Sequence, residues 1–154
     1  NNLRNSKSGI IAEHKRRSPS KSVINNGLNV QDVAKGYEDA GVCGMSVLTD
    51  GKYFGGSLDD LLTARASCNL PLLRKEFIID TYQILEAKAY GADAILLIAA
   101  ALTQQQVFTL STLANNLAVI SILVLFSVSY FEPNFIFISV PSSFSINNST
   151  ISLS

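Results

Sequence analysis

Short apolar runs alternate with helix-like segments along the first 117 residues, and this alternation restricts the fold more than any other feature. The apolar runs are expected to form strands at residues 9–15, 45–48, 70–77 and 94–99. The segments that follow them are expected to form helices at residues 30–40, after Ser57, from Asp80 to Tyr90 and from Thr103 to Leu117, with a loop at 49–56. Repeated strand–helix order implies an α/β fold, in which right-handed crossovers join parallel strands. The strands lack clean polar alternation, which is typical of parallel strands that are buried on both faces.

Polar residues at the expected start of each helix support these boundaries. A side chain that accepts a hydrogen bond from the first turn is provided by Asn29, Ser57, Asp80 and Thr103. Gly41 follows the first helix and is expected to end it. The pattern therefore predicts four β/α units in a row.

The end of the first strand carries a dense group of charged and hydroxyl side chains. Glu13 and Lys15 are two residues apart, so on a strand they point to the same side. Two opposite charges on a buried strand need a partner, a cavity or a substrate. The following loop adds further cations and hydroxyls at Arg16, Ser18, Ser20 and Lys21. Such a set suits a small anionic substrate.

The same stretch resembles a known enzyme family. Residues 12–21 read Ala-Glu-His-Lys-Arg-Arg-Ser-Pro-Ser-Lys, which closely resembles the first-strand signature of the indole-3-glycerol-phosphate synthases. Three more blocks follow in the family's order at residues 46–57, 70–78 and 91–98. The resemblance covers about residues 8–117.

The resemblance implies a partial TIM (β/α)8 barrel. A complete barrel takes about 250 residues, and residues 1–117 correspond to its N-terminal half. Residues 118–154 are expected to be a non-family tail, irregular and apolar, of which 119–131 could begin a fifth strand. The tail is interpreted as a frameshifted translation, and the chain as an inactive fragment that begins inside a longer reading frame.

The family closes the indole ring of 1-(2-carboxyphenylamino)-1-deoxyribulose 5-phosphate in tryptophan biosynthesis, with loss of carbon dioxide and water and without cofactor or metal. By resemblance, Lys75 is the general acid, Lys15 contacts the substrate and assists proton transfer, and Glu13 orients it. The alternatives are a strand-end lysine that reaches solvent at position 75 and a mutual salt bridge between Glu13 and Lys15. That salt bridge is compatible with the catalytic assignment.

The resemblance also implies residues that bind the substrate. Ser18 and Pro19 shape the loop over it, and Phe54 and Phe77 enclose its anthranilate ring. The alternative for both aromatic residues is packing in the hydrophobic core. His14, the only histidine, is interpreted as packing between strand and helix rather than as a catalyst.

Charge limits the partners and divides the chain. The net charge is zero, which gives no reason to expect nucleic acid or a membrane as a partner. Cys43 and Cys68 have no metal-type spacing, and free thiols fit a reducing cytoplasm. After Asp93 the only charged residue is Glu132, so the family's further catalytic Glu on strand five has no counterpart in these residues.

Two other hypotheses remain. The chain could be a non-catalytic half-barrel that acts in assembly or at a membrane, with self-association through the open sheet edges of strands one and four. Another phosphate-sugar barrel, such as phosphoribosylanthranilate isomerase, is disfavoured by the Ser-Pro-Ser and Arg-Lys-Glu-Phe blocks.

Overall fold

The structure is a computed structural model that describes residue 6, residues 8–20, residue 24, residues 27–124 and three two-residue strands beyond them. The strands are β1 (Ile11–His14), β2 (Gly44–Leu48), β3 (Leu72–Lys75), β4 (Ala94–Ile98), β5 (Ile120–Val124), β6 (Phe135–Ile136), β7 (Ile146–Asn147) and β8 (Thr150–Ile151). The helices are α2 (Val30–Asp39), α3 (Gly51–Phe54), α4 (Leu58–Ser67), α5 (Thr81–Ala89), α6 (Gln104–Asn116) and the 3₁₀ turn η1 (Ala99–Ala101).

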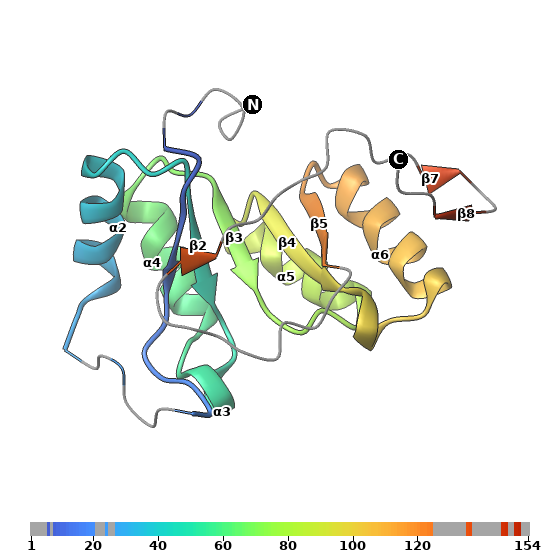
Figure 1. Cartoon of the computed structure of the whole chain (residues 1–154), viewed down its shortest axis with the longest axis horizontal. Coiled ribbons are helices and arrows are strands. Elements are labelled where there is room, and N and C mark those ends of the chain that lie inside the picture. Colours follow the sequence, from blue (N-terminus) through green and yellow to red (C-terminus); the bar gives the residue numbers. More distant parts are fainter. Residues whose placement is uncertain are drawn as a thin grey trace.

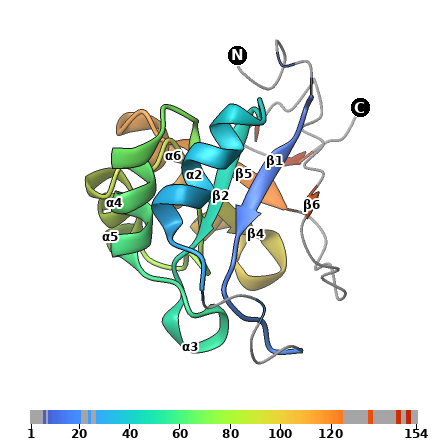
Figure 2. The same ribbon diagram turned by 90° about the vertical axis from the view of Figure 1, so that its left-hand side faces the viewer.

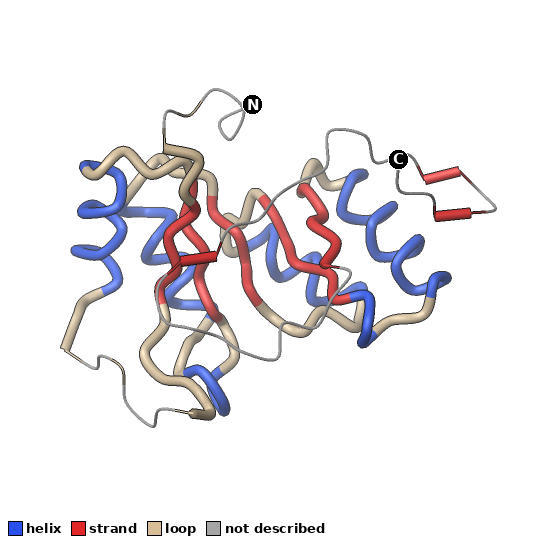
Figure 3. Tube along the Cα trace, viewed as in Figure 1, coloured by secondary structure: helices blue, strands red, loops and turns tan. Residues whose placement is uncertain are grey.

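The sheet follows chain order across its parallel part. Its strand order is β5-β4-β3-β2-β1-β6, and β1 to β5 are parallel neighbours (Figures 1 and 3). The short strand β6 pairs antiparallel with β1, where Ile11 lies opposite Ile136. An open, consecutively ordered parallel sheet of β/α units is part of a (β/α)8 barrel, as predicted.

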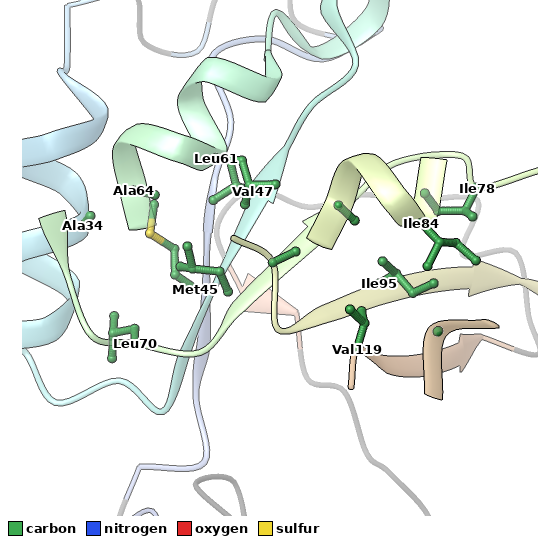
Figure 4. Close-up of a cluster of buried hydrophobic side chains, with 14 of the residues drawn as sticks. Ala34, Met45, Val47, Leu61, Ala64, Leu70, Ile78, Ile84, Ile95 and Val119 are labelled. Carbon is green, nitrogen blue, oxygen red and sulfur yellow. The ribbon is translucent and has the colours of Figure 1, made fainter. Parts of the chain in front are cut away.

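The longer helices lie together on one side of this sheet. Figure 2 shows α2, α4, α5 and α6 on the side away from β1 and β6. Between helices and sheet lies one hydrophobic core, in which Met45 and Val47 of β2 meet Leu61 of α4, and Ile95 of β4 lies near Ile84 of α5 (Figure 4). These five side chains are fully buried, and burying each apolar side chain of this size stabilises the fold by about 1.5–3 kcal/mol.

Side-chain caps begin the helices where the sequence predicts. The Asn29 carboxamide accepts a hydrogen bond from the main-chain N–H of Gln31, and the Ser57 hydroxyl accepts one from Asp60. Asp80 and Thr103 each form a reciprocal capping box with the glutamine three residues later. Each cap satisfies donors that the first helical turn leaves without a partner, which contributes about 1 kcal/mol.

The structure corrects three details of the sequence interpretation. Residues 51–54, expected to lie in a loop, form the short helix α3, because the Asp50 carboxylate accepts a hydrogen bond from the main-chain N–H of Tyr53 and starts a turn. The predicted first, third and fourth strands are one to four residues longer than the observed ones, and the second is one residue shorter. Strand four is not an edge of the sheet, since β5 pairs with it along its whole length, and strand one has β6 on its outer side. Within the described residues, no helix combines the length and the apolar character needed to cross a bilayer.

Candidate active site

Three charged side chains meet on the face of the sheet that is opposite the helices, at the C-terminal end of the strands. Glu13 lies on β1, Lys15 follows β1 directly, and Lys75 is the last residue of β3. The parallel register places Glu13 beside Ser46 of β2, and Ser46 beside Leu73 of β3. Because side chains alternate along a strand, Lys75 points to the same face as Leu73 and Glu13.

The Glu13 carboxylate is held between two ammonium groups. Its Oε2 accepts a hydrogen bond from Lys75 Nζ at 2.6 Å, and its Oε1 lies 3.3 Å from Lys15 Nζ. The side chains are almost out of solvent, with exposed fractions of 4% for Glu13, 7% for Lys15 and 12% for Lys75. The expected salt bridge between Glu13 and Lys15 is therefore present, and Lys75 joins it instead of extending into solvent.

Burial sets the protonation behaviour of Lys75. Loss of hydration lowers the pKa of its ammonium below the ordinary value, since burial disfavours the charged form. The Glu13 carboxylate opposes this by its charge and its hydrogen bond, and the positive charge of Lys15 adds to the lowering. The result is an ammonium that gives up its proton more readily than a lysine in water.

The loop after β1 carries Ser18 and Pro19 and is tied to the loop after β2. Ser18 is half-buried and its hydroxyl lies 3.1 Å from that of Ser20, while Pro19 is exposed. Arg16 donates hydrogen bonds to both oxygens of the Asp60 carboxylate on α4, one of them at 2.7 Å. This ion pair fastens the loop beside the three charges.

The Arg16–Asp60 pair also shifts the pKa values of its own two groups and of His14 on β1. The hydrogen bond that Arg16 donates to Asp60 raises the pKa of Arg16. Burial acts to raise the pKa of Asp60, but the hydrogen bond and charge of Arg16 lower it overall. Burial and the neighbouring Arg16 lower the pKa of His14, whose Nε2 has no hydrogen-bond partner. His14 is buried on the helix side of β1, which agrees with its interpretation as a packing residue.

Helix α3 and the glycines after it lie against the loop that follows β1 and the end of β2. The main-chain oxygen of half-buried Phe54 accepts a hydrogen bond from Arg17 N–H at 3.3 Å, and the Arg17 guanidinium also donates to the main-chain oxygen of Gly51. A Cβ at Gly56 would lie 1.9 Å from the main-chain oxygen of Leu48, so only glycine allows this close approach. Phe54 is thereby held next to the loop after β1.

Phe77 is exposed just after the end of β3 rather than packed in the core. It follows Lys75 by two residues and is 49% exposed, whereas its neighbour Ile78 belongs to the hydrophobic core. Core packing, the alternative for Phe77, is therefore wrong. An exposed aromatic ring two residues after Lys75 is available to a flat ligand.

Sequence reasoning missed the residues on the helix side of the same strand ends. Arg74 is buried between β3 and α5, where it donates to the main-chain oxygen of Gln83 at 2.6 Å and lies 3.3 Å from the Glu86 carboxylate. Thr49, which follows β2, accepts a hydrogen bond from Arg74 and donates one to Glu76. The available signal was the alternation along β3, which places Arg74 and Glu76 on the side opposite Lys75.

Two further features of the described residues bear on the site. No group of three or more His, Cys, Asp or Glu side chains among them is placed to hold a metal ion. An apolar hollow opens at the N-terminal ends of the strands, lined by Ile11, Leu73, Ala94 and Ile122 among others. It lies at the opposite end of the sheet from the two ammonium groups, so it does not belong to this site.

Comparison with known proteins gives a consistent result. The family model described as indole-3-glycerol phosphate synthase matches residues 1–128, a range that runs past Leu117 and takes in β5. Relatives named indole-3-glycerol phosphate synthase come from Bacteroides thetaiotaomicron, 51% identical over 115 residues, and Dechloromonas aromatica, 50% identical over 115 residues. A third, from Neisseria meningitidis serogroup C, is 47% identical over 123 residues.

The matches cover most of this chain and a smaller share of each relative. They include 75% of the chain for the first two relatives and 80% for the third, but only 44% and 47% of the relatives themselves. The chain thus spans about half the length of the curated relatives that it matches. The extent of the family model and the identity of these matches show that the chain belongs to the indole-3-glycerol phosphate synthase family.

Proposed function

We propose that the described half-barrel carries the acid–base part of an indole-3-glycerol-phosphate synthase site. The reaction is ring closure of 1-(2-carboxyphenylamino)-1-deoxyribulose 5-phosphate, with loss of carbon dioxide and water. The observation that supports this most directly is the contact of Lys75 and Lys15 with opposite oxygens of the buried Glu13 carboxylate. In (β/α)8-barrel enzymes the C-terminal end of the strands is where the chemistry takes place.

In this proposal Lys75 is the general acid that protonates the departing oxygen. Burial brings the pKa of its ammonium down from the ordinary value, and an acid whose pKa lies nearer the working pH transfers its proton more effectively. Glu13 holds Lys75 in place before the substrate arrives. Lys15, on the other oxygen of Glu13, is positioned to contact the substrate and to assist the proton transfer.

The proposed substrate also has an aromatic ring and a phosphate. Phe54 on α3 follows the C-terminal end of β2, and the exposed Phe77 follows that of β3, which supports a role in enclosing the anthranilate ring. Ser18 and Pro19 lie in the loop that Arg16 fastens to α4, and we assign them to the cover over the substrate. The phosphate anchor is assigned to the part of the family barrel that this chain does not match.

The test uses an extended protein, in which residues 1–124 are joined to the C-terminal half of the Bacteroides thetaiotaomicron relative. Replacing Lys75 with Ala is expected to lower turnover by about 10²–10⁴-fold, the usual contribution of a general acid. The measurement is the fluorescence of the indole product formed, with circular dichroism to verify that the fold survives.

Lys52→Ala is the matched control, because Lys52 is an exposed lysine on the neighbouring helix α3. It should leave turnover unchanged. Near-normal turnover in the folded Lys75→Ala protein would refute the assignment of the acid. A folded extended protein with no turnover at all would favour the non-catalytic half-barrel instead.

A further inference from the structure

Thr49, the residue after β2, makes three contacts with β3 at the strand end that carries Lys75. Its main-chain N–H donates to the main-chain oxygen of Lys75 at 3.2 Å. Its hydroxyl accepts a hydrogen bond from Arg74 Nε at 3.1 Å and donates one to Glu76 Oε2 at 2.8 Å. The single hydroxyl therefore holds both neighbours of Lys75 at once.

Arg74 is fixed on the far side of the strand as well. A buried guanidinium is strongly destabilising unless its donors are satisfied, and α5 satisfies two of them through the main-chain oxygen of Gln83 and the carboxylate of Glu86. Because Arg74 is buried between sheet and helix, it cannot rotate toward the opposite face. Lys75, which alternates with it, is correspondingly directed toward Glu13.

Glu76 extends the same arrangement to the exposed aromatic residue that follows it, Phe77. Its Oε2 is held by the Thr49 hydroxyl, and its Oε1 accepts a hydrogen bond from the main-chain N–H of Phe77 at 2.9 Å. Each residue from 74 to 77 is thus held by Thr49, by α5 or by the Glu76 side chain that Thr49 holds. No substrate-facing atom is used in this anchoring.

We propose that Thr49 is a positioning residue, which through Arg74 and Glu76 sets the reach of the Lys75 ammonium to Glu13 and the direction of Phe77. The inference rests on the proposed function only for the chemistry that Lys75 performs. The geometric part concerns where Lys75 Nζ lies, and that can be measured without substrate. A hydroxyl suits position 49, because a single hydroxyl oxygen can accept from Arg74 and donate to Glu76 at the same time.

The environment of Lys75 makes its position measurable. Among the described residues, the charged groups that act on its ammonium are Glu13 and Lys15 of the first β/α unit. The neighbouring strands β2 and β4 carry no charged residue. Contact with Glu13 raises the pKa of Lys75, whereas burial lowers it. Moving Nζ away from Glu13 while the site stays buried therefore lowers the pH at which the amine becomes reactive.

The experiment is competitive acetylation of the 154-residue chain with trace acetic anhydride across a pH series, in which peptide mass spectrometry gives the reactivity of each lysine. Thr49→Val keeps the side-chain volume and removes the hydroxyl. The expected result is a shift of the Lys75 midpoint to lower pH, with the exposed Lys52 unchanged. Thr49→Ser restores the hydroxyl and should return the midpoint to that of the parent.

The matched control is Ser111→Ala, since Ser111 and Thr49 are both 7% exposed and the Ser111 hydroxyl bonds within α6, remote from β3. It should leave the Lys75 midpoint unchanged. If Thr49→Val does not fold, Glu76→Ala removes the other half of the link at a less buried position and carries the same expectation. An unchanged Lys75 midpoint in a folded Thr49→Val or Glu76→Ala chain overturns the proposal.

The activity of the extended protein separates this inference from the proposed function. There Thr49→Val should lower kcat by about 10²-fold, the effect of a misplacement near 1 Å, while Thr49→Ser stays close to the parent. A shifted midpoint together with full activity of Lys75→Ala would leave the positioning role intact and disprove the assignment of Lys75 as the acid. Activity that depends on Lys75, together with an unshifted Lys75 midpoint in Thr49→Val, would support the acid and overturn the positioning role of Thr49.

Discussion

At the scale of single residues, the two charges next to Lys75 predict opposite shifts in the pH dependence of activity when Glu13 or Lys15 is replaced. If protonated Lys75 is the acid, kcat/KM of the extended protein falls as pH rises through the pKa of Lys75, which burial keeps below its ordinary 10.5. Glu13→Gln removes the charge that raises this pKa, so the alkaline limb should move to lower pH. Lys15→Met removes a charge that lowers it, so the limb should move to higher pH. Shifts in the same direction for both variants would contradict this electrostatic scheme.

Replacing Phe54 distinguishes a role in binding the substrate ring from a role in stabilising the fold. Phe54→Ala in the extended protein is expected to raise KM about fivefold, which corresponds to about 1 kcal/mol of lost aromatic contact. The melting temperature should change little, because Phe54 is only half-buried and lies outside the core cluster. Phe108→Ala is the control, since Phe108 is an exposed phenylalanine on α6. A drop in melting temperature with an unchanged KM would make Phe54 a packing residue.

At the scale of elements, the ends of α2 and α6 differ in the residue that turns the chain toward the next strand. Gly41 after α2 has a φ of 72°, and Ala118 after α6 has a φ of 54°, a left-handed conformation that is unfavourable for residues with a Cβ. Ala118→Gly should therefore raise the free energy of unfolding by about 1 kcal/mol. Gly41→Ala should lower it by a similar amount, since a Cβ there would contact nothing and only the backbone is strained. Urea denaturation measures both, and equal signs would contradict the backbone explanation.

The elements also show which features the sequence could predict. The four helix starts were predictable because each cap lies within three residues of the group that it bonds. The Glu13–Lys15 contact followed from alternation along one strand. The contact between Glu13 and Lys75 joins residues 62 apart and depends on the register of β1, β2 and β3, and the Arg16–Asp60 pair joins residues 44 apart. No local pattern specifies such a pair, so the sequence located Glu13 and Lys75 by resemblance and did not connect Asp60 with Arg16.

At the scale of the whole molecule, the distribution of charge predicts the behaviour of the isolated polypeptide. β4 and β5 carry no charged residue, and after Asp93 only Glu132 is charged. We therefore expect the 154-residue chain alone to form no indole-3-glycerol phosphate in the fluorescence assay in which the extended protein is active. Light scattering on the same sample tests self-association, which stays a prediction. Turnover by the isolated chain would show that the described charges suffice.

The two lysines on Glu13 also have a consequence for the order in which the chain acquires its structure. During synthesis, β1, α2 and β2 leave the ribosome before β3 exists, so of its two lysine contacts Glu13 can then meet only Lys15. The edge of β2 that β3 covers is open until β3 pairs with it. The ion pair of Lys75 with Glu13 spans β1 and β3, so the last charge to join the site also marks the completion of the first three strands.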